Sequence, residues 1–292
     1  MSAVSAGTAV PVRRKRMPVA QRVYRVFIYA LLTALSALFL VPLFWMVSSA
    51  LKSSSEVFVF PPVWWPKHPE WGNFKQALTT LPFGLYALNT LLIAVVNVVG
   101  NVVSCSLVAY GFARFRFPGR RILFMLLLST MMIPSQVLLV PQFIMYHDLG
   151  WINTFLPLTV PAFFGSAFYV FLLRQFFMTI PPELEEAARI DGAGTFRIFT
   201  TIVLPQIKPA LTAVAIFSFQ GAWNDFLSPL LYLNDQAKYT LQLGLTQFQG
   251  SFHTDWNLIM AASVVVILPM LIIFFLGQRY FVQGITMTGT KG

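Results

Sequence analysis

Long apolar segments alternate with short polar ones along the whole chain. Six segments of 19 to 25 residues are apolar on all sides, at 26–49, 88–112, 122–146, 155–173, 210–231 and 258–281. A helix of about 20 apolar residues spans the hydrocarbon core of a bilayer, which is about 30 Å thick. The segments lack the period-two alternation of a lipid-facing β-barrel. The pattern therefore predicts an all-α membrane protein with six transmembrane helices.

Positive charges give these six spans an orientation. Sixteen of the twenty Lys and Arg residues lie before the first span, between the second and third, between the fourth and fifth, or at the end of the sixth and beyond it. The intervening loops hold only Lys52, Lys67, Lys75 and Lys238. Cytoplasmic loops of membrane proteins carry the excess of Lys and Arg. We therefore expect both termini of this multi-pass protein to lie in the cytoplasm.

The composition agrees with a membrane protein. The 292 residues are 57% hydrophobic and 10% charged, whereas soluble domains are about 25% charged. These values exclude two classes of protein, an ordinary water-soluble enzyme and a disordered tail protein. The net charge of +10 is explained by the basic loops, so we expect no nucleic-acid partner.

Three parts of the chain follow from the spans. Residues 1–25 form a basic N-terminal segment, 26–281 the six-span domain and 282–292 a cytoplasmic tail. The first apolar run is far longer than the core of a signal peptide, which is about 7–15 residues. We therefore expect it to be retained as the first span.

Candidate chemistry for an enzyme is missing from the sequence. The glycines at 284 and 289 have the spacing of a P-loop, but the lysine follows the threonine instead of preceding it, so we expect no ATP binding by this chain. The three histidines lack metal-ligand spacing, and the single Cys105 cannot form an internal disulfide. We expect no metal, no cofactor and no catalytic residue.

Four polar residues within or beside the spans are candidates for lining a transport pathway. Asn97 and Asn101 lie four residues apart on one helix face, where they could also hydrogen-bond a neighbouring helix. Asn224 and Asp225 lie in an apolar span, where an acid usually faces a partner or a watery path. They could instead satisfy the backbone of a helix broken before Pro229. Both interpretations stay open for each pair.

The loop between the fourth and fifth spans, residues 180–205, predicts a helix, a glycine turn and a second helix outside the membrane. Prolines at 181 and 182 open the first helix, and glutamates at 183, 185 and 186 suit its first turns. Gly192 and Gly194 end it. Its small apolar side chains, set among charges, favour docking into a groove of a partner; packing on its own bundle is the alternative.

This loop resembles the coupling loop of ABC importer permeases. That motif is Glu-Ala-Ala, three residues, Gly, nine residues and Ile-x-Leu-Pro, and it stands here at 186–188, 192 and 202–205. The segments IDGA at 190–193, WNDF at 223–226 and QRYFVQG at 278–284 are similar to those of the maltose-type carbohydrate permeases. The tail departs from that family at 286–290.

The resemblance implies a six-helix type I importer bundle whose coupling helix seats in a cleft on a separate ATPase. In that scheme Glu186 pairs with a basic residue of the ATPase, and Gly192 provides the sharp turn. The residues implied in ATPase coupling are Glu186, Ala187, Ala188, Asp191, Gly192, Leu204 and Pro205.

The resemblance also implies partners and a substrate class. The partners are a second, non-identical permease, a cytoplasmic ATPase dimer and an extracytoplasmic solute-binding protein, all at a prokaryotic inner or plasma membrane. The cargo is a di- or oligosaccharide, or a related polyol such as a glycerol phosphate. The competing hypotheses are a stand-alone carrier, a membrane-embedded enzyme, and a scaffold or receptor. A carrier should show repeats and intramembrane ion sites, an enzyme a catalytic set, and a scaffold no coupling loop.

Overall fold

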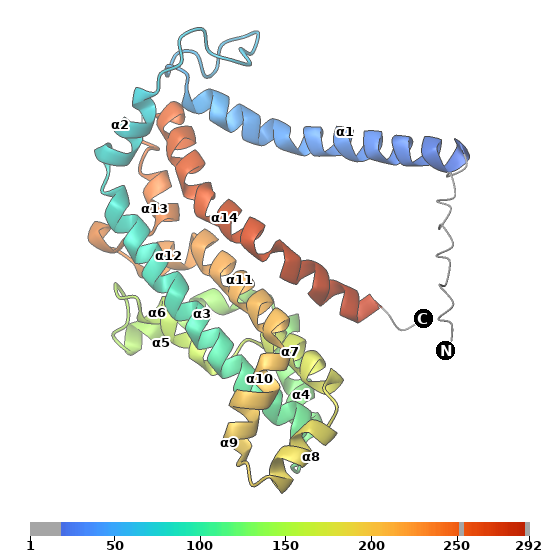
Figure 1. The fold of residues 1–292 in the computed structure, drawn as a ribbon. Helices are drawn as coiled ribbons and strands as arrows, with labels where there is room; N and C mark the ends of the chain where they lie inside the picture. Colours follow the sequence, from blue (N-terminus) through green and yellow to red (C-terminus); the bar gives the residue numbers. More distant parts are fainter. Residues whose placement is uncertain (1–18, 251–253, 290–292) are drawn as a thin grey trace, which may run out of the picture.

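Helices make up the regular structure of the computed structural model. It describes residues 19–250 and 254–289, the last eleven as backbone only, so the basic residues at 13–16 lie outside it. No strand occurs in these described ranges, where a single isolated bridge joins Gln249 to Thr254. Figure 1 shows the helices running between two ends of the molecule.

Four helices are long and apolar enough to cross a membrane. Three of them match predicted spans with longer ends: α1 (Val19–Ala50), α3 (Phe83–Arg114) and α14 (Trp256–Gly289). The fourth predicted span continues beyond its predicted end at 173. It consists of α6 (Leu156–Thr159), η2 (Val160–Phe164) and α7 (Ala167–Thr179).

The third predicted span, 122–146, is not one continuous helix. α4 (Arg120–Ser129) and η1 (Thr130–Met132) stop before Pro134, and α5 (Ser135–Asp148) departs at an angle of 100°. Proline lacks an N–H group and clashes with the preceding turn, so it ends the helix here. By contrast, α1 and α14 continue through Pro42 and Pro269.

The fifth predicted span, 210–231, is broken as well. α11 (Lys208–Asn224) ends where the backbone becomes extended at Asp225, and α12 (Leu227–Tyr232) follows. At its other end α11 meets the helical stretch Thr195–Gln206 at 82°. The structure therefore holds four membrane-length helices among the described residues, or up to six if each bent pair forms one span.

Loops predicted to share a side of the membrane lie at the same end of the bundle. Ser54 donates to Asn257 Oδ1 at 3.0 Å, which joins the first outer loop to the start of α14. Asn153 accepts from the backbone of Asn234 and Asp235. At the opposite end, Arg114 after the second span contacts the loop between the fourth and fifth. The basic loops and the loops between them thus lie at opposite ends of the bundle, in the alternating order of the charge pattern.

Short elements close the end of the bundle opposite Arg114. α2 (Gly72–Thr80), η4 (Gln236–Lys238) and α13 (Leu241–Thr246) pack there against the long helices. Beside them the Lys52 ammonium lies 3.9 Å from the centre of the Trp45 ring. Its burial lowers the pKa of Lys52, partly offset by Glu56.

α3 is the central helix of the bundle. Its buried residues contribute to two apolar clusters, one at each end. Tyr86 joins the cluster with α13 and α14, and Tyr110 joins the cluster with α7 and η3 (Ile198–Val203). Between them, an added methyl at Gly100 would lie 3.0 Å from Ala162, so α3 and η2 approach closely.

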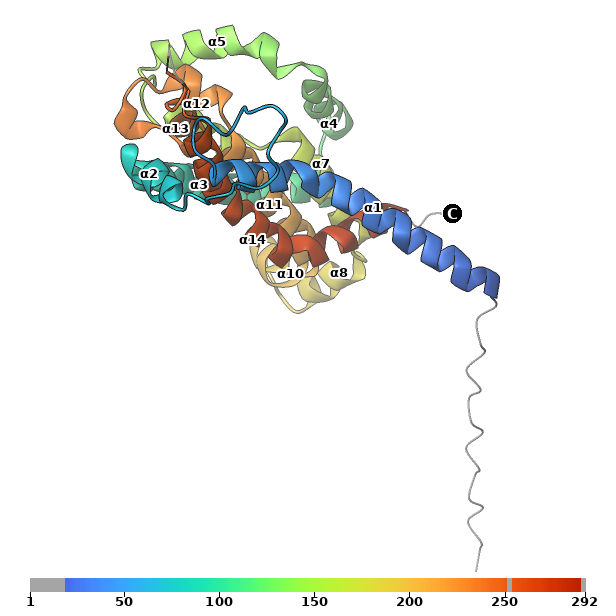
Figure 2. The ribbon, with the colours of Figure 1, turned by 90° about the horizontal axis from the view of Figure 1, so that it is seen from above.

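α1 extends away from this bundle. Figure 2 shows the C-terminal end of α1 at the bundle and its N-terminal part running out to one side. Its large side chains are exposed along most of its length, including Phe39 at 79%. An apolar helix with this exposure is suited to contact with lipid or with other membrane helices.

Replacing Gly244 by alanine is expected to destabilise the fold. The added methyl would lie 2.5 Å from the ring of Tyr86, which is fully buried. Overpacking of this kind costs about 1–3 kcal/mol, so the midpoint of thermal unfolding in detergent should fall. Gly84→Ala is the matched control, because nothing lies within 4 Å of the added atom. Equal stability of the two variants would contradict the close approach of α13 to α3.

Candidate functional site

The helical tip between α7 and α11 is the first candidate site. α8 (Glu183–Ile190) begins directly after Pro182 and carries three glutamates in its first turn, where the helix dipole favours acids. It ends at Ile190, and Gly192 forms the turn behind it with a φ of +81°, a left-handed conformation that other residues rarely adopt. The sequence thus predicts both ends of this helix.

The turn after α8 is a Schellman motif. Ala193 N donates to Ala188 O at 2.9 Å, and Gly192 N donates to Arg189 O at 3.0 Å. Ala193 also packs against the apolar cluster that contains buried Ala188, and an apolar contact often accompanies this motif. The turn is therefore well defined and depends on the glycine.

The chain then returns to the bundle as a second helical stretch. It consists of α9 (Thr195–Arg197), the π-helical η3 and α10 (Leu204–Gln206). Ile198 and Val203 are fully buried in the apolar cluster around Tyr110. The helix–glycine–helix pattern of 180–205 is therefore present, and its return arm is anchored in the core.

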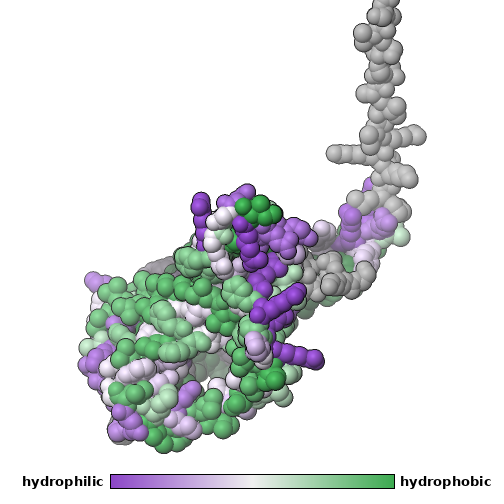
Figure 3. Space-filling view, turned by 90° about the horizontal axis from the view of Figure 1, so that it is seen from below, coloured by the Kyte–Doolittle hydropathy of each residue, from purple (hydrophilic) through white to green (hydrophobic). Residues whose placement is uncertain are grey.

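The tip has an exposed surface of mixed character. Ile190 is 87% exposed and Phe196 is 72% exposed, with Glu186, Ala187 and Asp191 around them. Figure 3, viewed from this end, shows hydrophilic residues gathered on a face that is otherwise largely hydrophobic. Apolar side chains set among charges are suited to docking in a partner's groove.

The predicted coupling residues do not all face outward. Ala188 is buried, Leu204 is partly buried and Pro205 is exposed. Glu185, which the sequence did not single out, is also buried and lies 2.6 Å from Arg114 Nε through Oε1. Its one sequence signal is its spacing of three residues from Ala188, which places both on one helix face.

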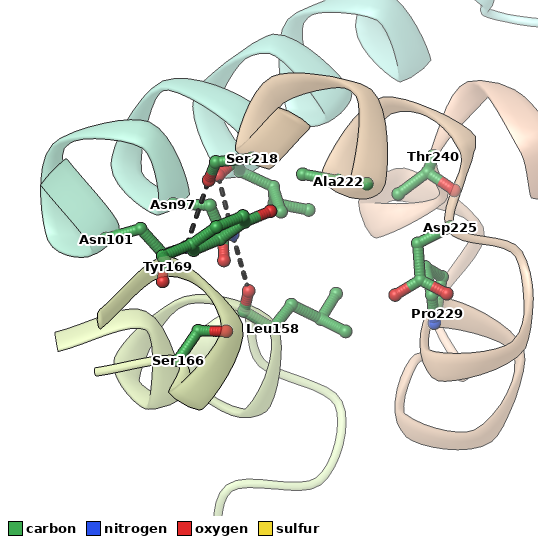
Figure 4. A pocket seen from close by; sticks show the side chains of 12 residues that line it. Asn97, Asn101, Leu158, Ser166, Tyr169, Ser218, Ala222, Asp225, Pro229 and Thr240 are labelled. Atoms are coloured by element: carbon green, nitrogen blue, oxygen red, sulfur yellow. Dashed lines mark hydrogen bonds between the residues drawn. The ribbon is translucent and has the colours of Figure 1, made fainter. Parts of the chain in front are cut away.

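A polar cavity in the middle of the bundle is the second candidate site. It has a volume of about 280 Å³ and is shown in Figure 4. Asn97 and Asn101 of α3 line it together with Asp225, and Figure 4 shows these asparagines across the opening from Asp225 and Thr240. The other lining residues come from α3, α6, α7, α11, α12 and their connections: Ile93, Leu158, Ser166, Tyr169, Ser218, Gly221, Ala222 and Pro229.

Both asparagines form hydrogen bonds between helices. Asn97 Nδ2 donates to Leu158 O at 2.7 Å, and Asn101 Nδ2 donates to Ser218 Oγ at 3.0 Å. They therefore join α3 to α6 and to α11 while they line the cavity. Thr240 Oγ1 is buried, lines the same cavity and has no hydrogen-bond partner.

Asp225 and Asn224 are separated by the break after α11. Asp225 Oδ1 accepts from Ser228 N at 3.1 Å, so it caps the start of α12 and also lines the cavity. Asn224 lines a different groove of about 300 Å³ between α11 and α14. Three of the four predicted pathway residues are thus brought together, and Asn224 is not among them.

Comparison with known proteins gives the family. A sequence model of the family "Binding-protein-dependent transport system inner membrane component" matches residues 101–287. The chain belongs to this family. The permease is therefore an inner-membrane subunit of a transport system and not a catalytic enzyme. The tip and all cavity-lining residues except Ile93 and Asn97 lie within the matched region.

Curated relatives cover most of the permease. It is 35% identical over 272 residues to a probable ABC transporter permease, YurM, of Bacillus subtilis, covering 91% of this chain and 87% of that protein. It is 36% identical to the diacetylchitobiose uptake permease NgcG of Streptomyces coelicolor, covering 86% and 84%. It is 37% identical to the sn-glycerol-3-phosphate permease UgpE of Pectobacterium atrosepticum, covering 84% and 90%.

Solved structures share the fold of the permease. The similarity to a chain of a bacterial ABC transporter that imports the acidic polysaccharide alginate has a TM-score of 0.80, with 23% identity over 91% of this chain and 99% of that chain. A chain of the alginate transporter bound to its periplasmic protein gives a TM-score of 0.65, with 15% identity over 89% and 96%. The permease thus shares its overall fold with these solved chains.

Proposed function

We propose that this permease forms half of the translocation pathway of an ATP-driven importer for neutral di- or oligosaccharides. The relatives that transport diacetylchitobiose and sn-glycerol-3-phosphate support a sugar or polyol as cargo. The observation that carries the proposal is the exposed helical tip at 183–197, because a carrier that works alone has no use for it. Its partners are a cytoplasmic ATPase dimer, a second and non-identical permease and an extracytoplasmic binding protein.

The cavity lining favours a neutral substrate over a phosphate ester. Asp225 is its single charged lining residue, and the rest are amides, hydroxyls, small residues and apolar side chains. Sugar hydroxyls can donate to a carboxylate and exchange hydrogen bonds with amides. An anionic substrate would be repelled by Asp225 and would find no lysine or arginine in the lining. We therefore assign Asn97, Asn101 and Asp225 to the pathway.

Asn224 has a different place in this proposal. It lies with Gln220 in the groove between α11 and α14, and both side chains are exposed. Polar groups exposed at membrane depth need a partner or water. Asn224 therefore lines the pathway where the second permease subunit closes this groove.

The membrane arrangement in the proposal has six spans and two cytoplasmic termini. The bent pair Arg120–Met132 and Ser135–Asp148 counts as the third span and α11 as the fifth, and the basic loops then fall on the side of the tip. The domain limits remain 1–25, 26–281 and 282–292, with the coupling loop at 180–205. On the opposite side, the loop with exposed Phe60 and Trp71 offers a surface to the binding protein.

In the coupling step, α8 seats in a cleft of the ATPase, which alone hydrolyses ATP. Glu186 is exposed and available for an ion pair with the ATPase, while Ala187 allows a close approach. Asp191 and Gly192 form the end of the helix, and its buried Ala188 faces the bundle. Leu204 and Pro205 belong to the return arm, where Leu204 packs against the same apolar cluster as Ala188. Rocking of the bundle between two states then exchanges access to the pathway.

Gly192→Asp is expected to uncouple uptake while the protein remains in the membrane. An aspartate is strained at φ +81°, so the turn would change, although no neighbouring atom lies within 4 Å of the added Cβ. Sugar uptake in cells should fall strongly at unchanged membrane abundance. Gly194→Asp is the matched control, since Gly194 has an ordinary φ of −68°. Normal uptake by the Gly192 variant would refute the docking assignment.

Purification in mild detergent tests the assembly. The tagged wild-type chain should recover an ATPase and a second permease, identified by mass spectrometry, whereas Glu186→Lys should recover about tenfold less ATPase because a like charge replaces the ion-pair partner. Glu183→Lys is the control, as Glu183 is exposed on the same helix. Recovery of wild-type chain alone, active in uptake without ATP, would mean a stand-alone carrier.

Asp225→Asn is expected to slow sugar transport severalfold. The exchange keeps the oxygen that caps Ser228 but replaces a carboxylate oxygen by a donor group. Uptake into proteoliposomes at saturating binding protein measures the effect. Asp235→Asn is the matched control, because Asp235 caps Ala237 in the same way outside the cavity. Equal rates for the two variants would remove Asp225 from the pathway.

A further inference from the structure

We propose that Glu185 clamps the coupling helix to α3, so that α8 and the pathway-lining helix move as one rigid body. This inference rests on the proposed function and adds a positioning residue to it. Neighbouring Glu186 would bind the ATPase, whereas Glu185 would hold α8 to the permease's own bundle. Successive residues of a helix point about 100° apart, so the two glutamates can serve two different partners.

Each carboxylate oxygen of Glu185 has its own partner on α3. Oε1 lies 2.6 Å from Arg114 Nε, an ion-pair contact, and Oε2 accepts from Tyr110 Oη at 3.0 Å. The side chains of Glu185 and Arg114 are only 4% and 13% exposed. Oε2 also lies 3.8 Å from Arg189 Nη2, which belongs to α8 itself. The ion pair with Arg114 and the hydrogen bond from Tyr110 therefore fix the buried carboxylate to α3, because the loss of either leaves the buried charge less well compensated.

The same two α3 residues hold every arm of the tip. Arg114 Nη2 donates to Ile180 O at 2.7 Å, which fixes the end of α7. The Tyr110 ring packs against Phe177 of α7 and Phe199 of η3, with centroids 5.6 and 4.9 Å apart. Entry arm, coupling helix and return arm therefore meet at one turn of α3.

α3 connects this turn to the cavity without interruption. Residues 97, 101, 110 and 114 lie on one helix that contains no proline. Tyr110 and Asn101 are nine residues apart, which is about 14 Å along the axis. A continuous helix is stiff over this distance, and its kinks arise at prolines or bulges. A displacement of α8 would therefore reach Asn101 directly.

The reconstituted complex of both permeases, the ATPase dimer and the sugar-loaded binding protein provides the test. Glu185→Gln should lower the sugar transported per ATP hydrolysed by about fivefold or more, while ATPase recovery stays at the wild-type level. Glu183→Gln is the matched control on the exposed side of α8. A wild-type ratio for Glu185→Gln would overturn the proposal. Loss of uptake and of ATPase recovery in the wild-type complex would instead reject the proposed function itself.

If the Glu185→Gln variant does not assemble, a distance measurement can test the proposal with Glu185, Tyr110 and Arg114 left unchanged. Spin labels at Glu183→Cys and Leu107→Cys, both exposed positions, report on α8 and α3 in a Cys105→Ser background. Their separation should change by less than about 2 Å between the nucleotide-free and ATP-trapped complexes, because larger shifts require the elements to slide. A larger change would show that α8 moves independently of α3 and would overturn the clamp.

Discussion

Burial of one face of α3 is the interaction on which the rest of the structure depends. Apolar surface gains little by leaving lipid for another helix, so helices in a bilayer associate through close packing of small residues and through hydrogen bonds. α3 supplies both: Gly100 admits η2, and Asn97 and Asn101 bond to α6 and α11. At its end, Arg114 receives the coupling tip. The cavity and the tip therefore have a common support, and each is placed relative to the other by one helix.

The apolar pattern predicted which segments are helical better than it predicted where those helices break. Spans one, two and six are helices at the expected places, because an unbroken apolar segment in lipid must satisfy its own backbone. Segments three and five are also long and apolar, yet they break near Pro134 and at Asp225. A proline favours a break in a helix, but the 100° bend at Pro134 depends on the helices around it, since α14 passes Pro269 as one helix. Composition alone does not distinguish these cases.

The same limit applies to the site residues. Gly192 could be assigned from sequence because glycine at a helix end carries a specific backbone conformation, and its φ of +81° agrees. Glu185 could not, because three glutamates in one turn look equivalent and its partner Arg114 lies 71 residues earlier. Asn224 and Asp225 are neighbours that the sequence assigns to one pathway. The helix break between them places Asn224 in the groove with α14 and Asp225 in the cavity. Tertiary contacts decide both cases.

The two regions on α3 use different interactions, and their tasks explain the difference. The tip is held by a buried ion pair with a hydrogen bond from Tyr110, which is costly to break and little affected by salt because it is shielded from solvent. The cavity is lined mainly by neutral amides and hydroxyls, whose hydrogen bonds can be exchanged with water or sugar at small net cost. A transporter has to release its cargo in every cycle but must not lose the contact that transmits force. Strong ionic contacts in the cavity would retain the cargo, and weak neutral contacts at the tip would let α8 move without α3.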